Sequence, residues 1–106
     1  MEKRSKAETL IGFCLKARKC KTGMNAVKTL RRANLIIVCN TASENTVKEA
    51  RGLSEKWRAE LYVTAVKPLA EYVHKDNVKV MAVTDKIFAD GLAQGVTDGD
   101  FKRYGN

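Results

Sequence analysis

The chain has 106 residues, of which 44% are hydrophobic, and a formal net charge of +8. This length fits a single domain, residues 1–106, with one core, and excludes two full domains. No apolar run approaches the roughly 20 residues that span a bilayer, and the N-terminus has no apolar signal segment, so we expect a soluble, cytoplasmic protein.

The positive charge lies in the first third of the chain. Residues 1–32 hold ten Lys and Arg side chains, Lys3 and Arg4 among them, against two Glu, whereas residues 33–106 hold ten basic and ten acidic side chains. Such clustering is typical of a surface that binds nucleic acid or another polyanion. A basic face that contacts only solvent is the alternative.

The first 32 residues predict two helices joined by a short basic segment. Apolar residues recur at helical spacing from Ala7 to Ala17. The segment KARKCKT follows and fits a short strand or turn, after which Thr22 and Gly23 precede a second helix over 24–32. Thr22 is a candidate cap of that helix.

Strands and helices alternate in the rest of the chain. The apolar run over 35–39 is typical of a strand buried on both faces, and further strands are expected over 61–64 and 79–84. The spacing of Thr41 and Glu44 predicts a capping box, with Ser43 as a second possible cap, for a helix that ends near Trp57. Pro68 suits the first turn of a short helix, and Asp85 caps a last one.

This alternation predicts an α/β fold, a three-layer α-β-α sandwich around a mixed central sheet of about four strands. The tail from about residue 94 is rich in Gly and Asp and is expected to be flexible.

The sequence offers no set of residues for catalysis. His74 is the only histidine, no Gly-rich phosphate loop occurs, and Asp98 and Asp100 lack the spacing of a calcium loop. The three cysteines contain no Cys-x-x-Cys pair, so we expect reduced thiols rather than disulfides or a zinc site. We therefore expect no enzyme activity, no cofactor and no metal.

The residues around Gly23 favour a nucleic-acid-binding site over a catalytic or metal site. A helix that begins there would offer free N–H groups to an anion, and lysines and arginines flank it on both sides. Asn25 could present its amide to a base edge, although an ordinary first-turn polar residue is the alternative. Few aromatic residues accompany the segment, which favours structured RNA over stacked single strands.

The segment LIGFCLKARKCKTG over residues 10–23 resembles the opening of the L-seven-Ae/L-thirty-e superfamily of ribosomal and kink-turn RNA-binding proteins, especially its small bacterial members. Blocks at 33–39, 42–46 and 81–85 resemble the family in the same order. The resemblance covers roughly residues 8 to 92. It implies an α-β-α sandwich that binds a kink-turn, a bent RNA helix with a bulge beside sheared G·A pairs.

Residues of the family's RNA-contacting motifs match in part. Gly23 and Asn25 match the motif that reads the G·A pairs, whereas Ala26 replaces its acidic residue and Thr29 its lysine, with Lys28 one position early. The family's second contact loop aligns with residues 69–75 and has lost both glycines here. A relaxed or altered RNA target is therefore left open.

The sequence thus predicts a non-catalytic RNA-binding protein that is associated with the ribosome or another ribonucleoprotein, with ribosomal RNA and ribosomal proteins as partners. A protein-interaction adaptor, using apolar contacts at Tyr72, Val73 and Tyr104, is the alternative. The residues predicted to contact RNA are Lys19, Lys21, Thr22, Gly23, Asn25, Lys28, Arg31, Asn40, His74 and Lys75.

Overall fold

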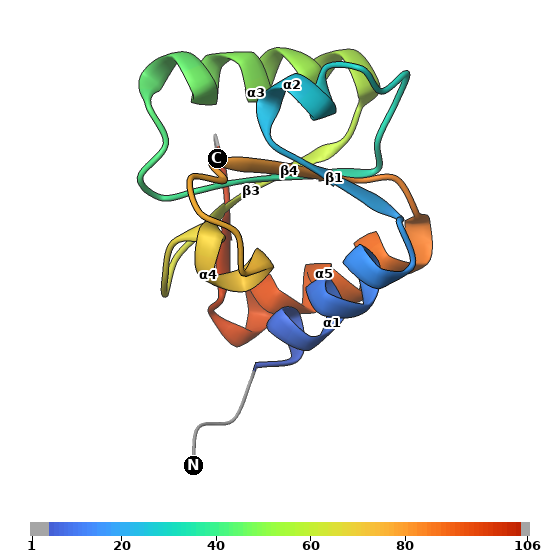
Figure 1. Cartoon of the computed structure of the whole chain (residues 1–106), viewed down its shortest axis with the longest axis vertical. Helices are drawn as coiled ribbons and strands as arrows, with labels where there is room; N and C mark the ends of the chain where they lie inside the picture. The colour runs from blue at the N-terminus through green and yellow to red at the C-terminus, as the bar shows by residue number, and fades with distance from the viewer. Residues whose placement is uncertain (1–4, 105–106) are drawn as a thin grey trace.

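The computed structural model describes residues 5–104, so Lys3 and Arg4 lie outside the described residues. Its elements in chain order are α1 (Lys6–Lys16), β1 (Cys20–Thr22), α2 (Met24–Val27), β2 (Leu35–Val38), α3 (Glu44–Trp57), β3 (Glu60–Thr64), α4 (Leu69–Val73), β4 (Val80–Val83), α5 (Lys86–Asp98) and β5 (Phe101–Arg103). The strands form one mixed sheet in the order β1-β4-β2-β3-β5. Figure 1 shows α2 and α3 on one face of this sheet and α1, α4 and α5 on the other. The fold is the predicted α-β-α sandwich.

The centre of the sheet is the most deeply buried part of the chain. All residues of β2 and β4 are buried. Strand β2 pairs in parallel with β3 and antiparallel with β4. Because side chains alternate along a strand, Leu35 and Ile37 pack into the core beneath α1 and α5, while Ile36 and Val38 pack beneath α2 and α3. This explains why the segment is a continuous apolar run.

Side-chain caps set where three helices begin. The Ser43 hydroxyl accepts the Thr46 N–H at 3.2 Å, which makes Ser43 the cap of α3. Asp85 accepts the N–H groups of the first residues of α5, as predicted. Ser5 caps α1 through the Glu8 N–H at 3.1 Å. Pro68 occupies the N-cap position of α4 rather than its first turn.

The sheet has five strands rather than about four because a short strand is added at each edge. The basic segment after α1 forms β1, and residues of the expected flexible tail form β5. Phe101 anchors that tail, since its buried ring lies 6.2 Å from the Tyr62 ring and 5.6 Å from the Tyr72 ring between centroids. Gly99, at φ 92°, ends α5 and turns the chain into β5. The expectation of a flexible tail from about residue 94 is thus corrected as far as residue 104.

Helix α2 is shorter than the predicted helix over 24–32. Gly23, not Thr22, takes its N-cap position, and no side chain caps it. The Thr29 hydroxyl donates to the Ala26 carbonyl at 2.6 Å and the Leu30 N–H donates to the Val27 carbonyl at 3.1 Å. These contacts form a tight turn that follows the single turn of α2. The Thr29 hydroxyl occupies a backbone carbonyl that a continuing helix would use, and thus competes with the helical hydrogen bonds.

Candidate nucleic-acid interface

Separate segments of the chain meet where β4 begins. The Gly23 N–H donates to the Val80 carbonyl at 2.8 Å, and the Cys39 N–H donates to the Lys79 carbonyl at 2.8 Å. The Asn40 N–H donates to Thr64 Oγ1, at the end of β3, at 2.9 Å. The ends of β1, β2 and β3 therefore share one edge of the sheet with the loop that precedes β4. We call residues 22–25, 39–41 and 74–79 the β4-start surface.

Gly23 and Asn25 form the first segment of this surface. Gly23 has φ 87° and ψ 140°, a conformation that side-chain-bearing residues rarely adopt, and it turns the chain from β1 into α2. Asn25 follows in the first turn of α2 with its side chain exposed. Because α2 has a single turn, its dipole is weaker than that of the predicted longer helix, and the Asn25 amide is the exposed polar side chain of this turn.

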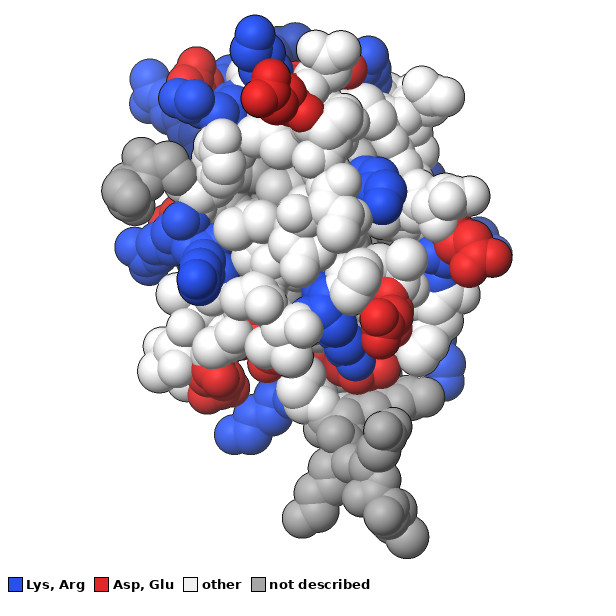
Figure 2. Space-filling view, turned by 90° about the vertical axis from the view of Figure 1, so that its left-hand side faces the viewer, with Lys and Arg blue, Asp and Glu red and all other residues white. Residues whose placement is uncertain are grey.

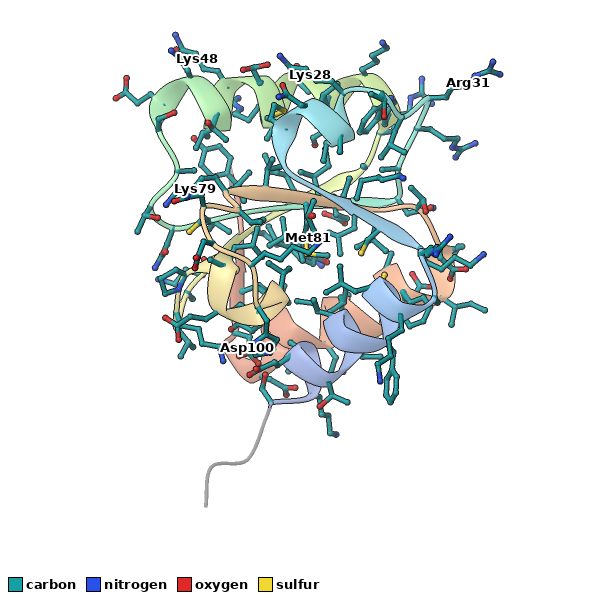
Figure 3. All side chains as sticks on the ribbon, in the orientation of Figure 1. Lys28, Arg31, Lys48, Lys79, Met81 and Asp100 are labelled. Carbon is teal, nitrogen blue, oxygen red and sulfur yellow. The ribbon has the colours of Figure 1, made fainter. Side chains whose placement is uncertain are left out.

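Lys79 belongs to this surface and was missed by the sequence reasoning. Its Nζ donates to Thr41 Oγ1 at 2.8 Å, which joins the start of β4 to the segment after β2. Figure 3 shows Lys79 at the side of the molecule where these segments meet. A basic residue directly before a buried strand was the available signal, but the sequence reasoning treated it only as the start of the strand.

The loop over 74–79 brings further positive charge. His74 ends α4 in the left-handed conformation at φ 55°, and the exposed Lys75 follows it. The pKa of the Cys20 thiol is lowered mainly by its hydrogen bond with the Cys14 thiol. Burial raises this pKa, and the charges of Lys75 and Lys21 lower it further.

The Cys39 side chain connects segments at the same edge of the sheet through hydrogen bonds. Its Sγ accepts the N–H groups of Leu69 at 3.3 Å and Thr41 at 3.5 Å. Burial alone would raise the pKa of this thiol, but the hydrogen bonds from Thr41 and Leu69 and the charge of Lys79 outweigh it, so the pKa is lowered. Like Cys14 and Cys20, Cys39 is a free, buried thiol, as expected.

Four of the predicted RNA-contacting residues lie outside the β4-start surface. Lys21 is an exposed residue of β1 that pairs with Ala82 of β4. The Lys19 carbonyl accepts the Thr84 N–H at 2.8 Å, so Lys19 lies at the opposite end of β4. Figure 3 shows Arg31 on the opposite side of the molecule from Lys79. Lys28 forms an ion pair with Glu49 of α3, which offsets its charge.

The basic first third does not fold into one patch. Lys6 and Lys16 lie on α1, on the opposite side of the sheet from Lys28 in the α2 segment. Figure 2 shows the side where the β4-start surface lies, with basic and acidic side chains spread around a largely uncharged centre. The clustering seen in the sequence is thus divided between two layers by the fold.

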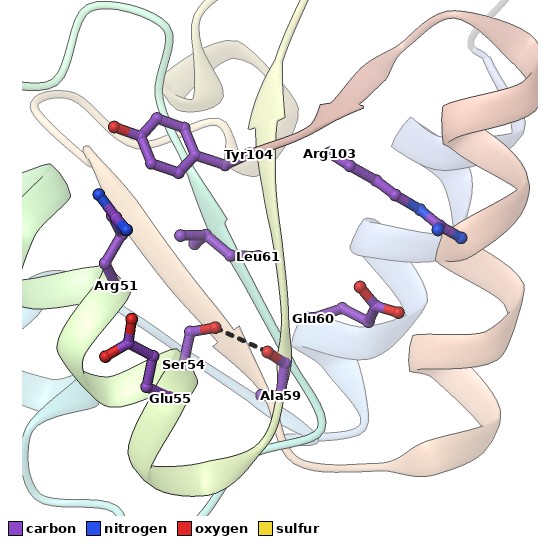
Figure 4. Close-up of a pocket in the computed structure, with 8 residues that line it drawn as sticks. All are labelled: Arg51, Ser54, Glu55, Ala59, Glu60, Leu61, Arg103 and Tyr104. Atoms are coloured by element: carbon purple, nitrogen blue, oxygen red, sulfur yellow. Dashed lines mark hydrogen bonds between the residues drawn. The ribbon is translucent and has the colours of Figure 1, made fainter. Parts of the chain in front are cut away.

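A separate hollow lies beside α3 and the end of β5. It has a volume of about 240 Å³, and the Arg51 guanidinium lies 5.7 Å from the centroid of the Tyr104 ring at its rim. Figure 4 shows Arg51 and Tyr104 on the same side of the sheet, facing each other. None of the predicted RNA-contacting residues lines this hollow. The residues that do are Arg51, Ser54, Glu55, Ala59, Glu60, Leu61, Arg103 and Tyr104.

The apolar residues named for the adaptor alternative are mostly inside the protein. Tyr72 is 0% exposed and Val73 is 3% exposed, so neither can contact a partner, and only Tyr104 reaches the surface. Tyr72 and Val73 lie on the face of α4 that packs into the core.

In the described part of the chain, no helix is both long and apolar enough to cross a lipid bilayer. The same part holds no cluster of three or more His, Cys, Asp or Glu side chains that could bind a metal ion.

Comparison with known proteins identifies the fold. The chain matches no protein-family model and no curated protein. It is similar to a solved structure described as a protein with unknown function from Bacillus halodurans C, with a TM-score of 0.73 and 24% sequence identity. The similarity covers 89% of this chain and 99% of that chain. At this identity the match shows that the two chains share a fold.

Proposed function

We propose that this protein binds structured RNA through the β4-start surface and catalyses no reaction. The observation that carries the proposal is the meeting of Gly23, Asn25, Asn40 and the loop over 74–79 at one edge of the sheet. In the superfamily that the sequence resembles, the segments matching Gly23 and the 69–75 loop contact a kink-turn. We further propose that the protein is cytoplasmic and that its target is ribosomal RNA or the RNA of another ribonucleoprotein.

The side chains at this surface divide into two kinds of RNA contact. Lys75 and Lys79 are exposed and would attract phosphates of any sequence. Asn25 and Asn40 are exposed amides that can donate to and accept from base edges. No exposed Phe, Tyr or Trp side chain lies within the surface, and the His74 ring is paired with Glu8, which favours recognition of a folded RNA shape over stacking on single-stranded bases.

A binding comparison between two RNAs tests the proposal. One is a kink-turn, and the other differs only in its disrupted G·A pairs. Fluorescence anisotropy over a salt series should give at least about tenfold tighter binding to the kink-turn, since one well-formed base contact discriminates by about 1–3 kcal/mol. Equal affinities would contradict recognition of the kink-turn, and failure to bind either RNA at low salt would contradict the RNA-binding function itself.

An adaptor function is the second candidate, and one observation favours it. Phe13 on α1 is 56% exposed and Ile87 on α5 is 81% exposed. Leu10 lies against Gly91 and Ala7 lies against Gly95, so α1 and α5 pack antiparallel, and Phe13 and Ile87 each lie about one helical turn beyond the contact of Leu10 with Gly91. If Phe13→Ser abolished binding to a partner protein while RNA affinity stayed unchanged, this candidate would be supported.

A further inference from the structure

A buried carboxylate joins three parts of the chain beneath the β4-start surface. Glu8, in the first turn of α1, is 8% exposed. Its Oε1 lies 2.6 Å from Nζ of Lys67, in the segment between β3 and α4, and its Oε2 lies 3.3 Å from Nε2 of His74, at the end of α4. Each oxygen of the carboxylate thus has a different partner.

Removing these partners from Glu8 would be costly. A carboxylate that has lost most of its solvent requires compensating charges and hydrogen bonds, and breaking such a pair destabilises far more than breaking a surface pair. The His74 side chain itself is largely exposed at 59%, so its position depends on few other contacts. Glu8 is therefore a strong constraint on where His74 lies.

The loop that follows His74 has an unusual backbone. His74 has φ 55° and Asn77 has φ 63°, and both residues are thus left-handed although neither is glycine. Such conformations cost energy and persist where the surroundings hold them. The Lys75 N–H donates to the Ala70 carbonyl at 3.2 Å, which closes the end of α4. Holding the His74 side chain supports this turn and, through it, the positions of Lys75 and Lys79.

We propose that Glu8 is a positioning residue for the RNA-binding surface, because it holds His74 and thereby fixes the loop over 74–79. The effect on RNA binding rests on the proposed function, whereas the effect of Glu8 on the loop does not. This inference also gives His74 a different role from the predicted RNA contact, since the imidazole nitrogen Nε2 is directed toward α1. The sequence carried a signal for Glu8, the Ser5-x-x-Glu8 spacing of a capping box, but the sequence reasoning did not use it.

Several other charged and polar groups surround the contact between Glu8 and His74. The other charged and titratable groups near this contact are Lys67, Glu71, Tyr72, Lys75, Asp76 and Asp100. Lys67 lies 4.9 Å from the centroid of the Tyr72 ring, and the Tyr72 hydroxyl donates to Asp100 Oδ1 at 2.8 Å.

Hydrogen exchange of the Lys75 amide tests the proposal without any RNA. Protection factors would be measured by NMR. Glu8→Gln keeps the shape of the side chain but removes its charge, so the protection of the Lys75 amide should drop about tenfold or more. Asp90→Asn, which removes the exposed Lys86–Asp90 pair, is the matched control and should change nothing.

A second variant covers the case in which Glu8→Gln fails to fold. His74→Asn is a change at an exposed side chain, and Asn tolerates the left-handed backbone, so the fold should be kept while the protection of the Lys75 amide falls. Unchanged protection in either folded variant would overturn the proposal.

The RNA measurement separates this inference from the proposed function. With the kink-turn RNA, Glu8→Gln should weaken binding several-fold and Asp90→Asn should not. If the unmodified protein bound no RNA, the proposed function would fail while the exchange experiment still decided the role of Glu8. If Glu8→Gln lowered the protection of Lys75 but left RNA affinity unchanged, positioning for RNA would be overturned.

Discussion

Asn25 and Lys21 sit close together in sequence but can recognise different features of an RNA. Asn25 is an exposed amide next to the Gly23 turn, whereas Lys21 is an exposed cation on the edge strand β1. An amide pairs with a particular base edge, and an ammonium group is attracted to every phosphate. The two residues therefore allow specificity and general attraction to be tested separately.

Asn25→Ala should weaken binding to the kink-turn by about 1–3 kcal/mol and binding to the G·A-disrupted RNA by less. The physical reason is that the lost amide contacts would have been made only with the matched bases. Anisotropy titrations of both RNAs measure the difference. Equal losses for the two RNAs would show that Asn25 is an ordinary polar residue of the first helical turn.

Lys21→Ala should weaken binding to both RNAs alike. Loss of one phosphate contact should also reduce the slope of log affinity against log salt concentration by about 1. Titrations at several salt concentrations provide this slope. A selective loss for the kink-turn, with the slope unchanged, would contradict a purely electrostatic role for Lys21.

Residue positions along the chain predicted the surface only in part. Gly23 and Asn25 were singled out because they match a motif of the family that the sequence resembles, with ordinary backbone and first-turn roles as the alternative. Lys19 and Arg31 were grouped with them because they are near in sequence. Strand β1 (Cys20–Thr22) lies between Lys19 and Gly23, however, so these two residues are at opposite ends of the strand. Lys79 and Glu8 were missed because their partners, Thr41 and His74, are distant in sequence.

At the scale of the elements, the packing of α5 against β5 is the feature that sequence reasoning did not foresee. Gly95 is buried in α5 because the Phe101 ring lies against its backbone, and a Cβ there would be 2.6 Å from Phe101 Cδ2. Gly52 in α3 is also helical, but it is exposed and a Cβ there would meet no atom within 4 Å. These two glycines form a matched pair for testing the anchoring of the tail.

Gly95→Ala should lower the free energy of unfolding by about 1–3 kcal/mol, since the added methyl group would displace a packed aromatic ring. Gly52→Ala should raise it by about 0.5–1 kcal/mol, because alanine favours the helix and nothing obstructs it. Urea denaturation followed by circular dichroism measures both. Similar stabilisation by the two changes would mean that Phe101 does not hold β5 in place.

Local patterns predicted the central elements well, and they also indicated a short strand or turn at β1 and a short helix at α4. The apolar run of β2 and the cap Asp85 were correctly interpreted, whereas Ser43, the second possible cap, caps α3 in place of the expected capping box of Thr41 and Glu44. Strands β1 and β5 have three residues each and exist because they pair with β4 and β3. Helix α2 ends after one turn through the contact of Thr29 with Ala26, which helical spacing alone does not reveal.

At the scale of the whole molecule, the fold divides the described basic residues of the first third between two layers instead of gathering them on one face. An RNA that contacted all of these cations would have to surround the protein. The β4-start surface instead occupies one edge of the sheet, where two exposed amides lie beside Lys75 and Lys79. The position of the proposed RNA site therefore does not follow from the net charge alone.

An NMR titration of the labelled protein with a kink-turn RNA tests that position most directly. We expect the largest backbone amide shift changes to fall on residues 22–25, 39–41 and 74–79, with small changes at Arg31 and near Phe13 and Ile87. Changes concentrated on α1 and α5, or spread evenly over all the basic residues, would contradict the β4-start surface as the RNA-binding site.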